Sequence, residues 1–98
     1  MEYERLEAIN EAVGADVRLV LHGCDGFTKD IYRKCIERGI TKVNINGAMN
    51  DEFVKVMGKS ADRKLTSIIA QGTDAMEAAV RGFMDELGSV GKAHLVQR

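Results

Sequence analysis

The stretch VRLVLHGCDGF, Val17–Phe27, decides the fold. Its first half is a run of valine and leucine, which is typical of a strand covered on both faces, as in a parallel sheet. The run stops at His22, and Gly23 and Gly26 follow in a segment that we expect to be a loop opening a helix. Such glycines let backbone N–H groups turn toward an anion at the helix N-terminus, although the same pattern also makes an ordinary tight turn.

The segments on both sides of this stretch have helical periodicity. Upstream, apolar residues within residues 2–14 recur at steps of three and four, and Gly14 is expected to end that helix. Downstream, Thr28 is placed to cap a helix over residues 28–39. The predicted buried side of this second helix comprises Ile31, Cys35 and Ile36.

A second strand, ITKVNING at residues 40–47, alternates strictly. Val43 and Ile45 point to one side, and Asn44 and Asn46 point to the other. If this strand lies beside the first, His22 and both asparagines face one cavity. An unsatisfied buried polar group costs about 1–3 kcal/mol, so such a face suits the lining of a site better than a core. The alternative is an edge strand whose polar side lies in water.

The rest of the chain is predicted to be helical. Residues 49–60 form a short helix, and residues 62–89 form a long helical segment that Gly72 and Thr73 are expected to break into two pieces. The inward residues of the short helix are predicted to be Phe53, Val54 and Met57. The apolar stripe of the long segment comprises Met76, Val80, Phe83 and Leu87, and Gly88 follows as a stop. Strands that alternate with helices predict parallel pairing through right-handed crossovers.

Composition excludes several classes of partner. The 98 residues suit one small domain, and 14 basic against 15 acidic residues give a net charge of −1, which offers no footprint for nucleic acid or an anionic membrane. The sequence has no apolar run of the ~20 residues that span a bilayer. Two cysteines are too few for a disulfide framework, which favours a reducing, cytoplasmic location. Residues 94–98 are expected to be a flexible tail.

Four blocks of the sequence, in order, resemble one family. LVLHGCDGF resembles the LVLHGGSGI segment of class II, zinc-dependent fructose-bisphosphate aldolases, and GITKVNING is similar to that family's GIxKINIDT. YERLEAINEAVG resembles LDxERLKEIxEAV, and MDELGSVGKA resembles xxxFGSAGKA. The resemblance implies an α/β fold: the last two βα units of a TIM (β/α)8 barrel with flanking helices. Residues 1–98 would then be a single partial domain, an incomplete barrel.

The resemblance also implies a site. The histidine of the family's HGG segment is a zinc ligand, which assigns Zn²⁺ to His22, where a neutral imidazole suits the metal. Gly23 and Gly26 match the glycines that bind the substrate phosphate, and Asn44 matches the asparagine that contacts the ketose phosphate. Asn46, on the same face, is a further candidate for substrate binding. No catalytic residue is expected in this chain, because a barrel needs ~250 residues and the missing strands supply the other ligands and the acid–base aspartate.

Four positions depart from the family pattern. Cys24 and Asp25 replace a glycine and the phosphate-binding serine, and Asn46 and Gly47 replace an aspartate and a threonine. The leading hypothesis is a lyase of carbohydrate metabolism, such as glycolysis, that acts on a sugar or sugar phosphate as a homo-oligomer. The alternatives are an interaction or assembly module without catalysis, and a sugar-binding pseudoenzyme. The isolated chain is expected to be inactive, and Cys24 and Cys35 are expected to be ordinary buried thiols.

Overall fold

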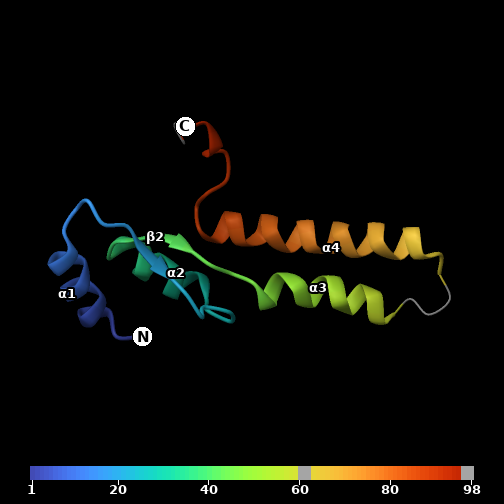
Figure 1. Ribbon diagram of the computed structural model, residues 1–98, viewed down its shortest axis with the longest axis horizontal. Helices are drawn as coiled ribbons and strands as arrows, with labels where there is room; N and C mark the ends of the chain where they lie inside the picture. The colour runs from blue at the N-terminus through green and yellow to red at the C-terminus, as the bar shows by residue number, and fades with distance from the viewer. Residues whose placement is uncertain (60–62, 96–98) are drawn as a thin grey trace. The chain divides into compact units, whose positions relative to one another are not determined.

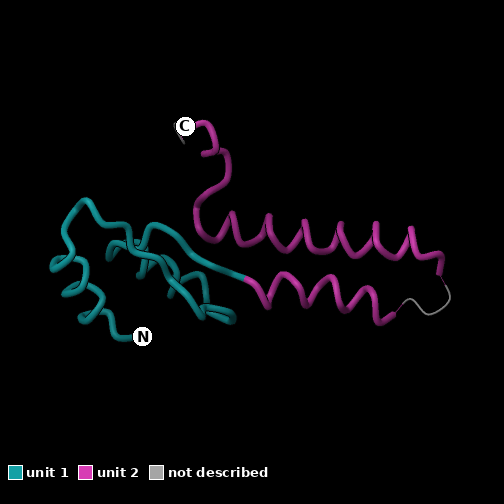
Figure 2. The backbone as a smooth tube through the Cα atoms, in the orientation of Figure 1, with its two compact units in different colours: residues 1–45 teal, residues 46–98 magenta. Residues whose placement is uncertain are grey.

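A computed structural model describes residues 1–59 and 63–95 of the chain. They fall into two compact units, Met1–Ile45 and Asn46–Arg98 (Figure 2). The elements of the first unit are α1 (Tyr3–Val13), β1 (Leu19–Leu21), α2 (Lys29–Glu37) and β2 (Ile40–Val43) (Figure 1). Those of the second unit are α3 (Gly47–Gly58), α4 (Leu65–Glu86) and the 3₁₀ turn η1 (Ala93–Leu95).

The two strands pair in parallel, with α2 as the crossover between them. Leu21 lies opposite Val43 in the register, and an irregularity falls between Leu19 and Val20. Helix α2 packs against β2 and also contacts α1. The predicted α/β arrangement of two parallel strands with flanking helices is therefore confirmed. The strands are shorter than the apolar and alternating runs that predicted them: β1 covers the last three residues of its run before His22, and β2 covers the first four residues of the run over residues 40–47.

The predicted ends of the first two helices are also observed. Gly14 ends α1 at φ 76°, a left-handed conformation that favours glycine. Thr28 caps α2, because its side-chain oxygen accepts a hydrogen bond from the Ile31 N–H at 3.4 Å. Inside α2 the predicted buried side needs correction. Ile36 is 40% exposed, whereas Tyr32 is fully buried beside Cys35. The buried side of α2 therefore runs through Tyr32 and Cys35, not through Ile31 and Ile36.

The predicted break at Gly72 and Thr73 is wrong, because α4 runs without interruption from Leu65 to Glu86. Gly72 is buried where α4 packs along α3, and a Cβ there would meet the Phe53 ring at 2.8 Å. The glycine therefore serves a close helix–helix contact. A helical glycine costs only about 1 kcal/mol relative to alanine, which packing of this kind can offset.

The apolar faces of the second unit are only partly as predicted. Phe53 is half-buried against α4, but Val54 is 62% exposed and Met57 is 37% exposed, so these two do not point inward. The stripe on α4 is half-buried along its length and comprises Met76, Val80, Phe83 and Leu87. Gly88 follows the helix at φ 69°, as the expected stop.

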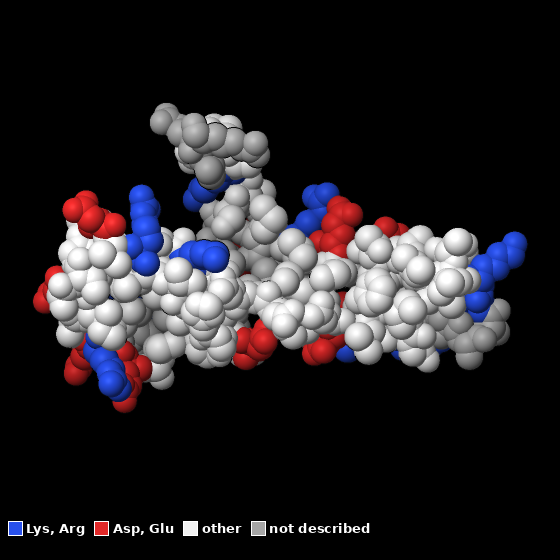
Figure 3. Space-filling model, in the orientation of Figure 1, with Lys and Arg blue, Asp and Glu red and all other residues white. Residues whose placement is uncertain are grey.

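The surface carries both signs of charge. Acidic and basic side chains are interspersed on the face of the described residues shown in Figure 3. Among residues 1–59 and 63–95, none of the helices combines the length and apolarity that crossing a membrane requires. The predicted tail begins in η1, and its residues 96–98 lie outside the described part of the chain.

Candidate functional site

The carboxyl ends of the two parallel strands bring two polar side chains together. His22 directly follows β1 and Asn44 directly follows β2. The Asn44 N–H donates to the Leu21 carbonyl at 3.0 Å, which continues the ladder one residue beyond the strands. The Asn44 carboxamide Nδ2 then lies 3.2 Å from the imidazole Nδ1 of His22, and both residues are exposed. Strand parity predicted this juxtaposition.

The contact links the tautomer of the imidazole to the orientation of the Asn44 carboxamide. Nδ2 of Asn44 carries only donor hydrogens, so it donates to Nδ1 of His22, and a neutral ring then holds its proton on Nε2. Turning the carboxamide over would present its oxygen to an Nδ1–H and leave the Nε2 lone pair free. The amide can therefore support either tautomer, which is the task of a group that orients a metal-ligating histidine.

The loop after His22 has a backbone that requires glycine at two positions. Gly23 has φ 64° and Gly26 has φ 85°, both in the left-handed region where a side chain brings strain. Apart from the chain neighbours of each glycine, no heavy atom lies within 4 Å of a Cβ built at either position, so no other described segment fills the space beside the two glycines. The loop thus turns tightly and still leaves room for a ligand to approach its backbone. Asp25, between them, is exposed.

The Cys24 side chain is fully buried within the first unit, unlike that of the exposed Asp25 next to it. Its thiol donates to the backbone carbonyl of Asn44 at 3.2 Å. Its own carbonyl accepts two hydrogen bonds, from the Phe27 N–H at 3.1 Å and from the Tyr32 hydroxyl at 2.8 Å. The predicted burial of Cys24 is confirmed, but its thiol also ties the loop to the end of β2.

Tyr32 is the residue of this region that the sequence did not single out. Its ring is fully buried and lies 5.8 Å from the Phe27 ring, centroid to centroid. The three-residue step from Tyr32 to Cys35 was the available signal, because both positions share one face of α2. Burial also raises the pKa of the Cys35 thiol, which keeps that group protonated.

Asn46, the other predicted site residue on β2's polar side, belongs to the second unit. It immediately precedes α3, and its carbonyl accepts from the N–H groups of Met49 and Asn50. Its side-chain oxygen accepts from Nδ2 of Asn50 at 2.6 Å. These contacts give Asn46 a clear local role at the start of a helix.

The residues present fit a metal ion only in part. In the described portions of the chain, no three histidine, cysteine, aspartate or glutamate side chains converge on one point. His22 is exposed at a strand end and has a polar partner on one ring nitrogen, which suits a single ligand of a larger site. A zinc site needs at least two further protein ligands, and these would come from outside the described residues.

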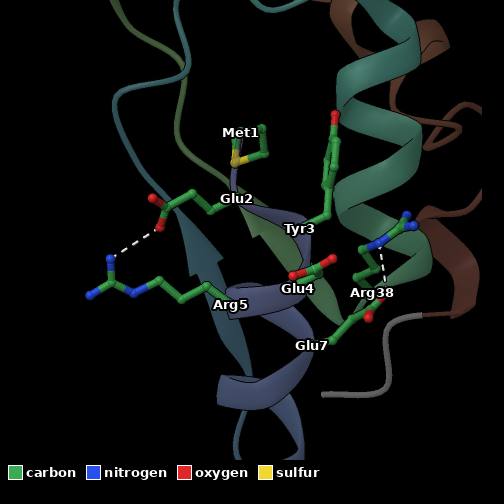
Figure 4. Close-up of a pocket in the computed structure, with 7 residues that line it drawn as sticks. All are labelled: Met1, Glu2, Tyr3, Glu4, Arg5, Glu7 and Arg38. Atoms are coloured by element: carbon green, nitrogen blue, oxygen red, sulfur yellow. Dashed lines mark hydrogen bonds and ion pairs between the residues drawn. The ribbon is translucent and has the colours of Figure 1, made fainter.

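A surface hollow near the N-terminus lies apart from these residues. Its lining comprises Met1, Glu2, Tyr3, Glu4, Arg5, Glu7 and Arg38 (Figure 4). The Arg38 guanidinium lies 4.9 Å from the centroid of the Tyr3 ring, and its Nε lies 2.8 Å from the Glu7 carboxylate. At that distance Arg38 and Glu7 form an ion pair, and Nε has no well-aligned hydrogen bond among the described residues. The hollow's charges are thus largely paired.

Comparison with known families decides the identity of this arrangement. The sequence matches the family model described as class-II fructose-bisphosphate aldolase over residues 1–92. The chain belongs to the class-II fructose-bisphosphate aldolase family. The strand ends with His22 and Asn44, and the glycine loop between them, are therefore parts of an aldolase fold.

Relatives within the aldolase family support the same placement. The chain is 54% identical over 97 residues to a Coccidioides immitis protein provisionally named fructose-bisphosphate aldolase. It is 35% identical over 96 residues to the 6-phospho-5-dehydro-2-deoxy-D-gluconate aldolase of Bacillus subtilis. These alignments cover 98% and 93% of this chain but only 32% of either relative. The chain thus spans about a third of the length of these aldolases.

Solved structures agree with the family assignment. A crystal structure from Coccidioides immitis, provisionally described as a fructose-1,6-biphosphate aldolase, matches with a TM-score of 0.93 at 54% identity. The YdjI aldolase from Escherichia coli K12 matches with a TM-score of 0.83 at 26% identity. The matches cover 98% and 95% of this chain and 37% and 36% of those chains. The chain thus matches a little over a third of each of these two aldolase structures.

Proposed function

We propose that the chain is the C-terminal part of a zinc-dependent class II ketose-bisphosphate aldolase, a lyase that makes or breaks a C–C bond in sugar phosphates. The observation that carries the proposal is the 3.2 Å contact of His22 with Asn44 at the carboxyl ends of adjacent parallel strands. In α/β barrels this end of the strands holds the active site. The proposed fold is the last two βα units of the TIM barrel, within a single partial domain.

In this proposal His22 holds zinc and the neighbouring residues hold the substrate. Bound Zn²⁺ supplies Lewis acidity, which polarises a ketone carbonyl. Asn44 orients the imidazole and can also meet a substrate hydroxyl, and Asn46 lies two residues further along the same sequence. Gly23 and Gly26 have space on the side where a Cβ would lie, their chain neighbours aside, and we assign their backbone N–H groups to binding an oxyanion. The acid–base residue and the remaining ligands belong to the rest of the barrel.

The side chains of the loop after His22 indicate which sugars the site would accept. Asp25 stands where the family has a serine that binds phosphate, and it is exposed beside two left-handed glycines. A carboxylate repels a phosphate dianion, whereas it accepts hydrogen bonds from sugar hydroxyls. These properties support a sugar other than fructose bisphosphate, including an unphosphorylated one. The Bacillus subtilis relative is named for a different sugar phosphate, so the family accommodates more than one.

A second candidate is a binding role without catalysis. Cys24 fills the position of a glycine, and the departures at Asp25 and Gly47 remove groups that hold phosphate. A sugar-binding pseudoenzyme or an assembly module would keep the fold under such changes. Exposed apolar side chains such as Val54 and Leu65, which are 62% and 66% exposed, favour association, including a homo-oligomer. The buried free thiols of Cys24 and Cys35 are compatible with the reducing cytoplasm that we propose.

The deciding experiment compares the two histidines of the chain in the complete protein. His22→Gln removes the proposed ligand, while His94→Gln is a matched change at the other exposed histidine, in η1. We expect His22→Gln to lower zinc content, measured by atomic emission. It should also lower retro-aldol cleavage by about tenfold or more, measured on whichever sugar or sugar phosphate of a panel the unmodified protein cleaves fastest. His94→Gln should change neither. Full zinc content and cleavage in His22→Gln would refute the proposal, and zinc without cleavage of any sugar in the unmodified protein would favour the pseudoenzyme.

A further inference from the structure

A continuous series of hydrogen bonds links the interior of the first unit to the exposed site. The buried Tyr32 hydroxyl donates to the Cys24 carbonyl at 2.8 Å, and the Cys24 thiol donates to the Asn44 carbonyl at 3.2 Å. The Asn44 carboxamide then reaches the His22 imidazole at 3.2 Å. Tyr32 and Cys24 are both fully buried, whereas Asn44 and His22 are exposed. The series therefore starts in the core and ends at the site.

The loop needs such an anchor. Cys24 stands between Gly23 and Gly26, and glycine has the greatest backbone freedom of any residue. A buried tyrosine hydroxyl must find a partner, and here that partner is the middle of this loop. The thiol adds a second attachment, to the end of the neighbouring strand. The glycines give the loop its turn, and the two buried side chains fix where it lies.

Asn44 is held on three sides as a result. Its N–H donates to the Leu21 carbonyl at 3.0 Å, and its carbonyl accepts from the Cys24 thiol. With both peptide groups fixed, the Cα–Cβ bond of Asn44 is fixed as well, and from there the carboxamide reaches Nδ1 of His22. Strand pairing alone secures the N–H but leaves the carbonyl side free to rotate at the point where β2 ends.

We propose that Cys24 and Tyr32 are positioning residues that hold Asn44 against His22. Both side chains are fully buried, and their hydrogen bonds go to the backbone carbonyls of Cys24 and Asn44, so each acts through that backbone. The geometric claim stands independently of any reaction. The effect of Cys24 and Tyr32 on substrate or metal binding rests on the proposed function. The placement of the imidazole and the carboxamide changes turnover only if they form an active site.

Cys35 provides a matched control for Cys24. It is an equally buried cysteine in the same unit, and its thiol makes no hydrogen bond to the described residues of the site. Cys24→Ala and Cys35→Ala remove the same atom from the interior, so both lose packing, but only the first removes the attachment to Asn44. Cys24→Ser keeps a donor in place. For Tyr32→Phe the matched change is Tyr3→Phe, at a half-buried tyrosine on α1.

The test measures the contact itself, by the nuclear Overhauser effect between the Asn44 side-chain amide and the His22 ring in the complete protein. We expect a strong signal in the unmodified protein, loss of at least half of it in Cys24→Ala and in Tyr32→Phe, and recovery in Cys24→Ser. Cys35→Ala and Tyr3→Phe should keep it. A signal that persists in Cys24→Ala and Tyr32→Phe overturns the proposal, and so does equal loss in Cys35→Ala, which would mark a general packing effect.

A kinetic arm separates this inference from the proposed function. Where the protein cleaves a sugar, Cys24→Ala should lower kcat/KM roughly three- to tenfold, the equivalent of one net hydrogen bond, and Cys24→Ser should restore most of it. An inactive protein whose amide signal still falls in Cys24→Ala supports the positioning role and refutes the lyase. A lower kcat/KM with an unchanged amide signal refutes the positioning role and leaves the lyase standing.

Discussion

Thr28 marks the residue at which the loop with His22 becomes helix α2. Its side-chain oxygen accepts from the Ile31 N–H at 3.4 Å, which satisfies one of the free donors at the helix start. Thr28→Ala should lower the free energy of unfolding by about 1 kcal/mol, measured by urea denaturation. Thr28→Ser keeps the oxygen and should retain most of the stability. Equal urea midpoints for the alanine variant and the unmodified protein would show that the cap contributes nothing.

Asp30, in the first turn of α2, carries a pH dependence with a definite sign. Hydrogen bonds from Lys34 and then Arg33 hold the pKa of this carboxyl below its usual range, at distances of 2.6 Å and 2.8 Å. A lowered pKa in the folded state stabilises the fold above the unfolded value of about 3.9, and this contribution is lost as the pH falls through the folded pKa.

Asp30→Asn should therefore lower the urea midpoint at neutral pH, and by less at an acidic pH below the unfolded pKa, where the contribution is being lost. The effect should be small, because Asp30 is half exposed and solvent screens the pair. Added salt should reduce it further. A difference that is the same at both pH values would show that the carboxylate stabilises α2 by some means other than its charge.

Some contacts of the candidate site could be predicted from the sequence and others could not. His22 and Asn44 were predictable, because alternation along a strand and the common edge of parallel strands fix their side without further information. The thiol bond of Cys24 and the hydroxyl bond of Tyr32 were not, because they depend on the path of a loop through two left-handed glycines. The placement of a side chain after a turn depends on tertiary structure, and the periodicity of the sequence does not predict it.

At the scale of elements, Gly72 and Gly82 offer a paired test within α4. A Cβ at Gly72 would meet the Phe53 ring at 2.8 Å, whereas a Cβ at Gly82 meets nothing within 4 Å. Gly82→Ala should stabilise the protein by about 0.5–1 kcal/mol through helix propensity. Gly72→Ala gains the same propensity but overpacks the contact between α3 and α4, and should destabilise by about 1–3 kcal/mol.

Thermal unfolding followed by circular dichroism would rank the two variants against the unmodified protein. Opposite shifts are the expected result, with the melting temperature of Gly82→Ala above and that of Gly72→Ala below. Stabilisation by both substitutions would show that the Phe53 ring moves aside at little cost. In that case the close contact between α3 and α4 would not explain why residue 72 is glycine.

Gly72 also explains why the predicted break in the long helix was wrong. A glycine next to a β-branched residue reads as a break, but α4 continues because its neighbour α3 compensates with the Phe53 contact. The caps at Gly14 and Thr28 were predictable, since each depends on a residue's own conformation or its own side chain. Val54 was assigned inward from spacing alone, and its 62% exposure shows that a short helix can present apolar residues to both sides.

For the whole molecule, the order of elements predicted the α/β fold class, whereas the incomplete barrel was predicted only from the family resemblance and the length of the sequence. Parallel sheets occur with both faces covered, and a two-stranded sheet is marginal by itself. In the described residues the sheet has β1 and β2 only, and the buried apolar residues are few: Cys24, Tyr32, Cys35, Ile40 and Ile68. The aldolases that match are about three times as long, so their remaining strands and helices are what such a small core lacks.

The 98 residues expressed alone should therefore behave differently from the same residues within a complete aldolase. Exposed strand edges and apolar side chains favour association, including Val17 at 50% exposure and Leu65 at 66%. We expect the isolated chain to scatter light as a species well above 10.8 kDa, to bind a hydrophobic dye and to show no sugar cleavage. The complete protein, with its sheet closed, should bind little dye. A dye-silent monomer of the isolated chain with sharp, dispersed amide resonances would contradict this. It would mean that the two units fold without the rest of a barrel, and would favour a free-standing binding module over part of a lyase.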